Sequence, residues 1–239
     1  MEAVGRQRTL SAYHLDMLAD VPLTDTGMPV MEGCDVTPDD LVGFNYATGR
    51  RTPRTQGVHF YVDDYQFERV WRDPIRYARV LDDYQCTLTP DFSLYTDMPI
   101  PMQRWNCYRS RFLGAYWQQL GLDVIPTLQW STPESYAFCF DGLPCGATLS
   151  VSTVGTLNHA ESRILWERGM REAISRLHPT LILLYGGEPK DFDWETTGHI
   201  RYENHNIGRM KKWADAEHRQ ADQDQDQDQE TDQETEAGC

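Results

Sequence analysis

The sequence lacks the signatures of several common protein classes. It has no apolar run near the roughly 18 residues that cross a bilayer, and acidic residues interrupt its start where a signal peptide needs a continuous apolar stretch. We therefore predict a cytoplasmic protein with no membrane association. The chain also has no GxGxxG after a strand, no Walker loop, no GxSxG elbow and no HExxH. These absences argue against dinucleotide redox, P-loop and zincin chemistry.

Cysteine and histidine are sparse and unpatterned. The six cysteines include no Cys-x-x-Cys pair, and Cys86, Cys107 and Cys139 lie among apolar neighbours in predicted elements. We expect reduced thiols packed as small hydrophobes, not a disulfide framework or a zinc site. The seven histidines are scattered, and His59, within an apolar strand, is expected to be a satisfied core residue.

Basic residues are scarce, with 22 Lys and Arg against 37 Asp and Glu and a net charge of -15. Eight of the acidic residues fall in residues 221–239, an Asp-Gln repeat without basic residues, so the rest of the chain carries about -7. This tail has little to bury and is expected to be disordered and solvating. A nucleic-acid mimic or an autoinhibitory arm is the alternative left open.

Apolar runs and amphipathic stretches alternate along the chain. The strand, helix and strand within residues 86–130 predict a right-handed βαβ crossover and a buried parallel sheet. Helices are expected at 65–81 (broken near Pro74), 104–120, 160–177 and within 199–220, with a short helix starting at 132–134. Strands are expected at 41–47, 58–62, 86–92, 124–130, 147–153 and 180–186.

This order of elements predicts one α/β domain over residues 41–220, after an irregular lead-in over residues 1–40 with at most a short helix around 11–19. The sheet should be mostly parallel, with about six strands and flanking helices, either open or an incomplete (β/α) barrel. Leu181–Leu184 should form a central strand, because four consecutive branched apolar residues suit burial on both faces.

Five sequence blocks follow one another along the predicted body: VDDYQFERVW, TPDFSLYTDMP, NCYRSRFLGAYWQQLGLDVIPTLQW, FDGLPCGATLSVSTVG and LILLYG. In this order they resemble an uncharacterised family of phage, plasmid and bacterial proteins, domain of unknown function 4417. The resemblance covers about residues 41–186. It implies a mobile-element setting and supplies no catalytic residues, since the family has no established activity.

Polar side chains follow most of the predicted strands. Ligands bind at the carboxyl edge of parallel sheets, so these side chains should converge on one rim. Asp91 and Asp63 are the candidate catalytic residues, because two carboxylates from different strands can hold a divalent cation or divide the roles of acid and base. The residues expected to contact a substrate are Asn45, Ser93, Arg109, Gln129, Trp130, Ser152, Thr153 and Tyr185.

Structural roles compete with these assignments. Asp64 precedes a predicted helix and fits an N-cap. Asp91 can pair internally with Arg109, because a buried carboxylate on a parallel strand must find a partner. The cluster of Arg50, Arg51 and Arg54 suits a solvated loop.

Two functional classes remain open. The first is a mobile-element hydrolase or lyase acting on a small phosphorylated or nucleotide-like substrate, with Asp91 as acid, base or metal ligand and Arg109 holding the anion. The second is a non-enzymatic binding module for a protein or nucleic-acid partner in phage or plasmid maintenance, with Trp and Arg exposed on a flat rim. Polar residues at successive strand ends favour the enzyme. The sequence leaves the substrate, the cofactor and the oligomeric state open.

Overall fold

A computed structural model describes residues 7–17, 21–49, 54–194 and 197–204 of the chain. Its contacts divide the chain into a unit of residues 1–202 and a unit of residues 203–239, and the helices and strands of the described residues lie in the first. Outside the described residues lie the predicted acidic tail, the expected helix beyond residue 204, and the loop arginines Arg50 and Arg51.

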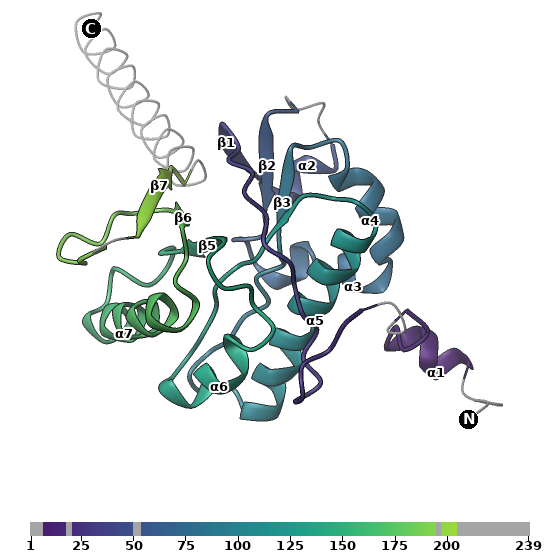
Figure 1. The fold of residues 1–239 in the computed structure, drawn as a ribbon, viewed down its shortest axis with the longest axis horizontal. Coiled ribbons are helices and arrows are strands. Elements are labelled where there is room, and N and C mark those ends of the chain that lie inside the picture. Colours follow the sequence, from purple (N-terminus) through teal and green to yellow (C-terminus); the bar gives the residue numbers. More distant parts are fainter. Residues whose placement is uncertain (1–6, 18–20, 50–53, 195–196, 205–239) are drawn as a thin grey trace, which may run out of the picture. The chain divides into compact units, whose positions relative to one another are not determined.

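Seven short strands in the described residues form two parallel sheets (Figure 1). The order of strands in space follows their order in the chain, as expected when each parallel strand is reached by a crossover. An isolated parallel bridge between Thr127 and Ser150 links the two sheets. The first sheet contains β1 (Asp40–Gly43), β2 (Gln56–His59), β3 (Cys86–Leu88) and β4 (Val124–Ile125). The second sheet contains β5 (Thr148–Ser152), β6 (Leu181–Tyr185) and β7 (Gly198–Tyr202).

The described strands do not close into a barrel, so the α/β class with an open, incompletely barrel-like sheet is confirmed. The prediction for Leu181–Leu184 is confirmed too, since β6 pairs in parallel with both β5 and β7.

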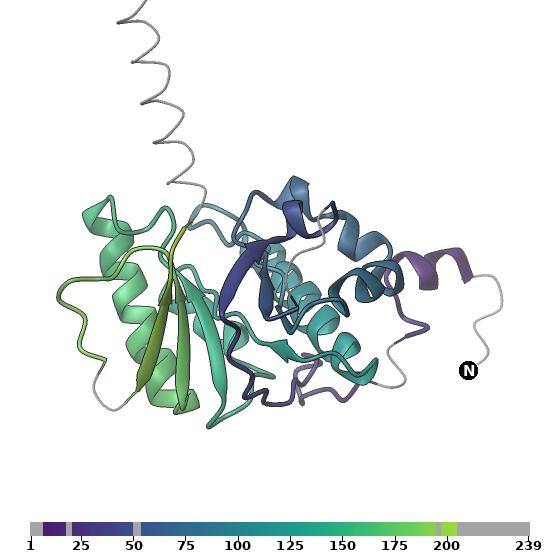
Figure 2. The ribbon, with the colours of Figure 1, turned by 90° about the horizontal axis from the view of Figure 1, so that it is seen from above.

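Helices cover the outer faces of both sheets (Figure 2). The helices packed on the first sheet are α3 (Arg69–Arg72), α4 (Pro74–Leu81) and α5 (Ile100–Gln119), and those on the second are α6 (Tyr136–Cys139) and α7 (Ala160–Leu177). The shorter pieces are α1 (Gln7–Ala12), α2 (Phe44–Ala47) and the 3-10 turns η2 (Asp64–Gln66) and η3 (Pro133–Ser135). In the described part of the chain, no helix combines the length and apolarity that a bilayer crossing needs.

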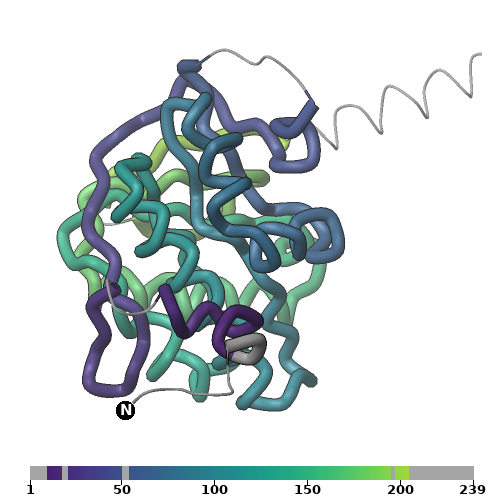
Figure 3. The backbone as a smooth tube through the Cα atoms, turned by 90° about the vertical axis from the view of Figure 1, so that its right-hand side faces the viewer, coloured from purple at the N-terminus to yellow at the C-terminus, as the bar shows by residue number. Residues whose placement is uncertain are grey.

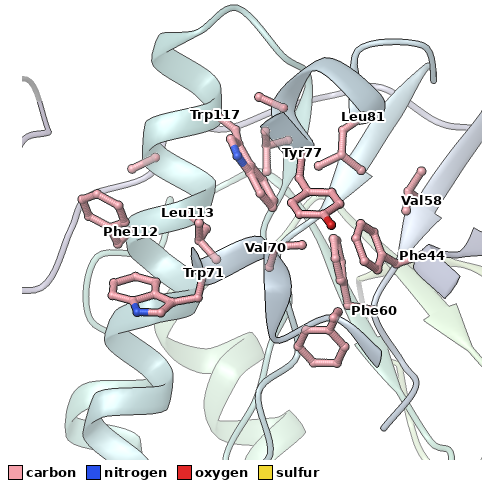
Figure 4. Packing of buried hydrophobic residues seen from close by; sticks show 14 of the residues in the cluster. Phe44, Val58, Phe60, Val70, Trp71, Tyr77, Leu81, Phe112, Leu113 and Trp117 are labelled. Atoms are coloured by element: carbon pink, nitrogen blue, oxygen red, sulfur yellow. The ribbon is translucent and has the colours of Figure 1, made fainter. Parts of the chain in front are cut away.

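Aromatic residues dominate the core beneath α4 and α5 (Figure 4). The rings of Phe44 and Phe60 stack with centroids 4.9 Å apart, and the indole of fully buried Trp117 donates to the carbonyl of Pro74 at 3.1 Å. Full burial of one such side chain contributes roughly 1.5–3 kcal/mol. This cluster is therefore a main stabilising element of the first sheet.

A separate buried cluster lies between the two sheets. Side chains alternate along a strand, so Leu183 and Tyr185 of β6 face this interior while Ile182 and Leu184 face α7. Leu41, Leu88 and Ile125 reach the same interior from β1, β3 and β4. Side chains from both sheets thus fill the space that a closed barrel would enclose.

Two predicted elements were wrong. Residues 44–47, expected to finish the first strand, form α2, because pairing with β2 ends at Gly43 and helical spacing buries both Phe44 and Ala47. Residues 198–202, where a helix was expected to begin, form β7. Tyr202 of β7 is buried, and its hydroxyl donates to the carbonyl of Pro38 at 2.8 Å.

The irregular segment that precedes β1 contributes to the core. Figure 3 follows it past the helices, and it buries Val21, Met28 and Met31. The amide of Met31 donates to the carbonyl of Gly142 at 2.9 Å, which fastens the segment to the turn after α6. The short helix lies earlier than expected, at α1.

Gly169 on α7 makes room for Trp130, whose indole donates to the carbonyl of Leu165 at 3.1 Å. A Cβ at residue 169 would overlap that indole. Gly169→Ala should therefore lower the free energy of unfolding by about 1–3 kcal/mol, although alanine is the better helix former. Urea denaturation measures the change. Gly49→Ala is the control, since a Cβ there meets no atom within 4 Å; equal losses in both variants would contradict the role given to Trp130.

Candidate functional site

Aromatic side chains face one another across the interior at the carboxyl ends of the strands. His59 ends β2, and it points inward with Tyr61 because Val58 and Phe60 take the outward positions. Tyr185 ends β6, and its ring centroid lies 4.1 Å from that of His59 and 5.2 Å from that of Tyr61. The two sheets therefore meet through these three rings.

A buried network of hydroxyl groups lies on the neighbouring strands. The amide of Thr127 donates to Oγ1 of Thr89 at 2.8 Å, and Oγ1 of Thr127 donates to the carbonyl of Thr89 at 2.8 Å. The hydroxyls of Thr127 and Ser150 lie 3.2 Å apart. These residues join β3, β4 and β5 directly below the segments that end at the carboxyl edge.

Asp91 follows β3 and is held by Gln129, whose Nε2 donates to Oδ1 of Asp91 at 3.2 Å and to the carbonyl of Phe92 at 3.1 Å. Loss of hydration raises the pKa of Asp91 to about 7; the bond from Gln129 opposes the rise and the negative charge of Asp64 adds to it. A carboxyl group that titrates near neutral pH is suited to act as an acid or a base.

Asp64, and not Asp63, is the carboxylate that reaches this edge from β2. It accepts hydrogen bonds from the amide of Ser93 at 3.1 Å and from the hydroxyl of Ser93 at 2.8 Å. These bonds tie the loop after β2 to the loop after β3. Asp63 is exposed, and Nε2 of Gln66 contacts it at 3.3 Å.

Two buried polar atoms at this edge make no hydrogen bond with the described residues: Oε1 of Gln129 and Oδ1 of Asn45. The hydroxyl of Tyr61 lies near those of Ser150 and Thr127 but makes no hydrogen bond of good geometry there. Each such atom costs about 1–3 kcal/mol, and native proteins keep few of them. Burial and the charge of Asp91 raise the pKa of Tyr61, and the nearby hydroxyls of Ser150 and Thr127 only partly oppose the rise, so its phenol stays a neutral donor. These atoms are the ones that a bound molecule would satisfy.

Gly43 leaves room for the side chains of Asn45 and His59 on either side of it. A Cβ at residue 43 would lie 2.6 Å from Oδ1 of Asn45 and 3.5 Å from Nε2 of His59. The amide of Tyr61 donates to Nδ1 of His59 at 3.1 Å, so a neutral His59 carries its proton on Nε2. His59 can therefore donate a hydrogen bond on the side where Asn45 presents an acceptor.

Two residues expected to contact a substrate make internal contacts instead. Nη1 of Arg109 pairs with Oε1 of Glu68 at 2.7 Å, and its guanidinium lies 3.8 Å from the ring centroid of Phe92. The internal ion pair expected between Arg109 and Asp91 is not among its contacts. Trp130 packs against α7 through its indole.

The hydroxyls at the ends of the second sheet shape local turns. Oγ of Ser152 accepts from the amide of Val154 at 3.0 Å, and Oγ1 of Thr153 donates to the carbonyl of Gly187 at 2.8 Å. Their contacts within the described residues fix the chain as it leaves β5 and β6.

His59 and Asp64 were not among the predicted site residues. The signal for His59 is the alternation in VHFYV, in which the apolar positions 58 and 60 interleave with His59 and Tyr61. Among the described residues, no group of three or more His, Cys, Asp or Glu could hold a metal ion. A divalent cation at this edge stays a prediction.

Comparisons with known proteins show that the chain is similar to two phage proteins and to one family of unknown function. A family model described as "Domain of unknown function (DUF4417)" matches residues 23–203. The chain is 39% identical over 194 residues to the Gene 1 protein of Mycobacterium phage L5, covering 80% of this chain and 84% of that protein. It is 40% identical over 161 residues to the Gene 1 protein of Mycobacterium phage D29, covering 66% of this chain and 60% of that protein. No solved structure matches.

Tyr61→Phe tests whether the unpaired phenol serves the fold. Removal of a buried hydroxyl without a hydrogen bond should leave the free energy of unfolding unchanged or raise it by about 1 kcal/mol. Tyr84→Phe is the matched control, because the hydroxyl of Tyr84 donates to the carbonyl of Ala47 at 3.0 Å and its loss should cost about 1 kcal/mol. Chemical denaturation compares the two, and an equal loss in both would mean that Tyr61 has a structural partner.

Proposed function

The chain belongs to the family described as domain of unknown function 4417, and from its carboxyl edge we propose that it is an enzyme of hydrolase or lyase type acting on a small polar molecule. The observation that carries the proposal is the placement of Asp91 after β3, where Nε2 of Gln129 holds it at 3.2 Å and burial raises its pKa to about 7, which suits proton transfer. Its position at the carboxyl edge of parallel strands is where ligands bind in such folds.

The neighbours of Asp91 supply complementary roles. Tyr61, a neutral donor whose hydroxyl makes no hydrogen bond of good geometry with the described residues, can stabilise negative charge that develops on a substrate. Gln129 orients Asp91 through Nε2 and leaves Oε1 for a substrate donor. Asp64, fixed by Ser93, adds a second carboxylate from another strand. One titrating carboxyl, one neutral donor and one fixed carboxylate form a suitable acid–base set.

The charge of this edge bears on the class of substrate. Arg109 was expected to hold a phosphate, but Glu68 already pairs with it. Asp64 and Asp91 both add negative charge to the edge, and Asp91 does so when ionised. A neutral or cationic polar substrate therefore suits the described residues better than a phosphorylated or nucleotide-like one.

The binding-module alternative has less support. It required Trp and Arg exposed on a flat rim, whereas Trp130 packs on α7 and Arg109 is buried beside Glu68. A shift of pKa toward neutrality is also of little use to a module that only binds. Turnover of a bound compound is what separates the two functions.

Asp91→Asn should change how stability depends on pH. An ordinary Asp titrates near pH 3.9, so between about pH 4 and 7 the folded chain holds a proton on Asp91 that the unfolded chain releases. The stability that the wild type draws from this proton is present at low pH and is lost as the pH rises toward 7. The variant should melt close to the wild type at pH 4 and at an equal or higher temperature at pH 8. A variant that melts well below the wild type at pH 8 would contradict the site.

A thermal-shift screen with small polar compounds and divalent cations tests the proposed function. Compounds that raise the melting temperature of the wild type should fail to raise that of Asp91→Asn, because the variant lacks the group that exchanges a proton with them. Asp63→Asn is the matched control, since that exposed carboxylate lies outside the set, and it should respond as the wild type does. Equal stabilisation of Asp91→Asn would exclude Asp91 from the site, and hits that are bound but never converted, by NMR, would favour the binding module.

A further inference from the structure

Two buried thiols face each other between α5 and α6. Sγ of Cys107 and Sγ of Cys139 are 3.3 Å apart, although 32 positions separate the residues in the chain. Both side chains are fully buried. The sequence predicted isolated thiols packed as small hydrophobes, and gave no sign that these two would meet.

A buried positive charge accompanies this pair. Arg111, one turn along α5 from Cys107, is fully buried; it donates to the carbonyls of Cys139 and Asp141, and its Nη1 has no partner among the described residues. A buried guanidinium is costly without a nearby anion. Burial opposes a thiolate at Cys139, yet hydrogen bonds from Cys107 and Ser135 and the charge of Arg111 outweigh it and lower the pKa of Cys139.

We propose that Cys107 and Cys139 are an oxidisable dithiol, which a peroxide converts to a disulfide. The thiolate of Cys139 attacks one oxygen of hydrogen peroxide and the O–O bond breaks. That oxygen stays on the sulfur as a sulfenic acid, and the other oxygen takes up a proton and leaves as water. The sulfur of Cys107 then attacks the sulfenic sulfur, a second water departs, and the S–S bond forms. Two thiols lose two electrons and two protons, and the peroxide takes them up as two water molecules.

The other described cysteines lack this arrangement. Burial raises the pKa of Cys34, and it raises that of Cys86 to about 12. Cys145 is exposed, and its thiol contacts only the carbonyl of Arg176, at 3.8 Å. The reaction should therefore select one pair out of the described thiols.

The oxidant reaches the pair through α6. This helix has only four residues and follows a single 3-10 turn, so it can open locally without unfolding the sheets. The new bond would enclose residues 107–139, including β4 and Gln129, and would tie α5 to α6. The proposal does not depend on the function proposed for the carboxyl edge.

The test uses the full chain with two substitutions, Cys145→Ser and Cys239→Ser. The first is needed because trypsin leaves Cys139 and Cys145 on one peptide, residues 112–163, and the second removes the C-terminal thiol as a competing partner. The folded protein is treated with hydrogen peroxide, alkylated with iodoacetamide in denaturant and digested without reductant. Mass spectrometry should find residues 105–109, which hold Cys107, joined to residues 112–163. Dithiothreitol should release the two peptides.

Single substitutions in the same background give the controls. Cys34→Ser should keep the link, and Cys107→Ser should abolish it while circular dichroism shows the same helix content. Two results would overturn the proposal: Cys107 and Cys139 remaining alkylated as free thiols while Cys34 or Cys86 is oxidised, or a link that forms only after denaturation. If Cys107→Ser does not fold, the proposal is still tested by whether the Cys107–Cys139 link forms in the chain that carries only Cys145→Ser and Cys239→Ser.

Discussion

A hydrogen-bond network around Pro126 joins the two sheets. Pro126 follows β4 and has no backbone N–H to donate. Its carbonyl accepts from the amide of Ser150 at 2.9 Å, while the amide of Leu128 donates to the carbonyl of Ser150 at 2.7 Å. Thr127 between them is anchored to Thr89 on the other side. The chain leaving β4 thus pairs with β3 through side chains and with β5 through the backbone.

That junction also decides what reaches the carboxyl edge. Thr127 faces the interior, so two positions later Gln129 faces it as well and meets Asp91. Trp130, one position further, must face the opposite way, and it packs on α7. A slip of one residue at Pro126 would exchange the two side chains, and the carboxyl edge would lose the group that orients Asp91.

Local pattern explains which parts of this fold could be read from the sequence. The amphipathic segment 160–177 forms α7 over the same residues, and the branched run 181–184 lies in the central strand β6, because period and burial agree there. The strand β7 was missed because its burial pattern is irregular at an edge of the sheet. The turn η2 determines whether Asp63 or Asp64 reaches the interior. The ion pair between Arg109 and Glu68 joins residues that are 41 positions apart in the chain. Strand periodicity encodes neither.

The contrast between two neighbouring groups of polar residues argues for a ligand at the carboxyl edge. Thr89, Thr127 and Ser150 are fully buried, and each hydroxyl among them makes a hydrogen bond. One layer closer to the edge, Oε1 of Gln129 makes none within the described residues, and the hydroxyl of Tyr61, although near Thr127 and Ser150, makes none of good geometry. The hydroxyls of one layer are therefore paired, while polar atoms of the next layer lack good hydrogen bonds, beside a carboxyl whose pKa is raised to about 7. Unfavourable polar groups of this kind concentrate where proteins bind and transform substrates, and the large aromatic core of the first sheet supplies the stability that offsets them.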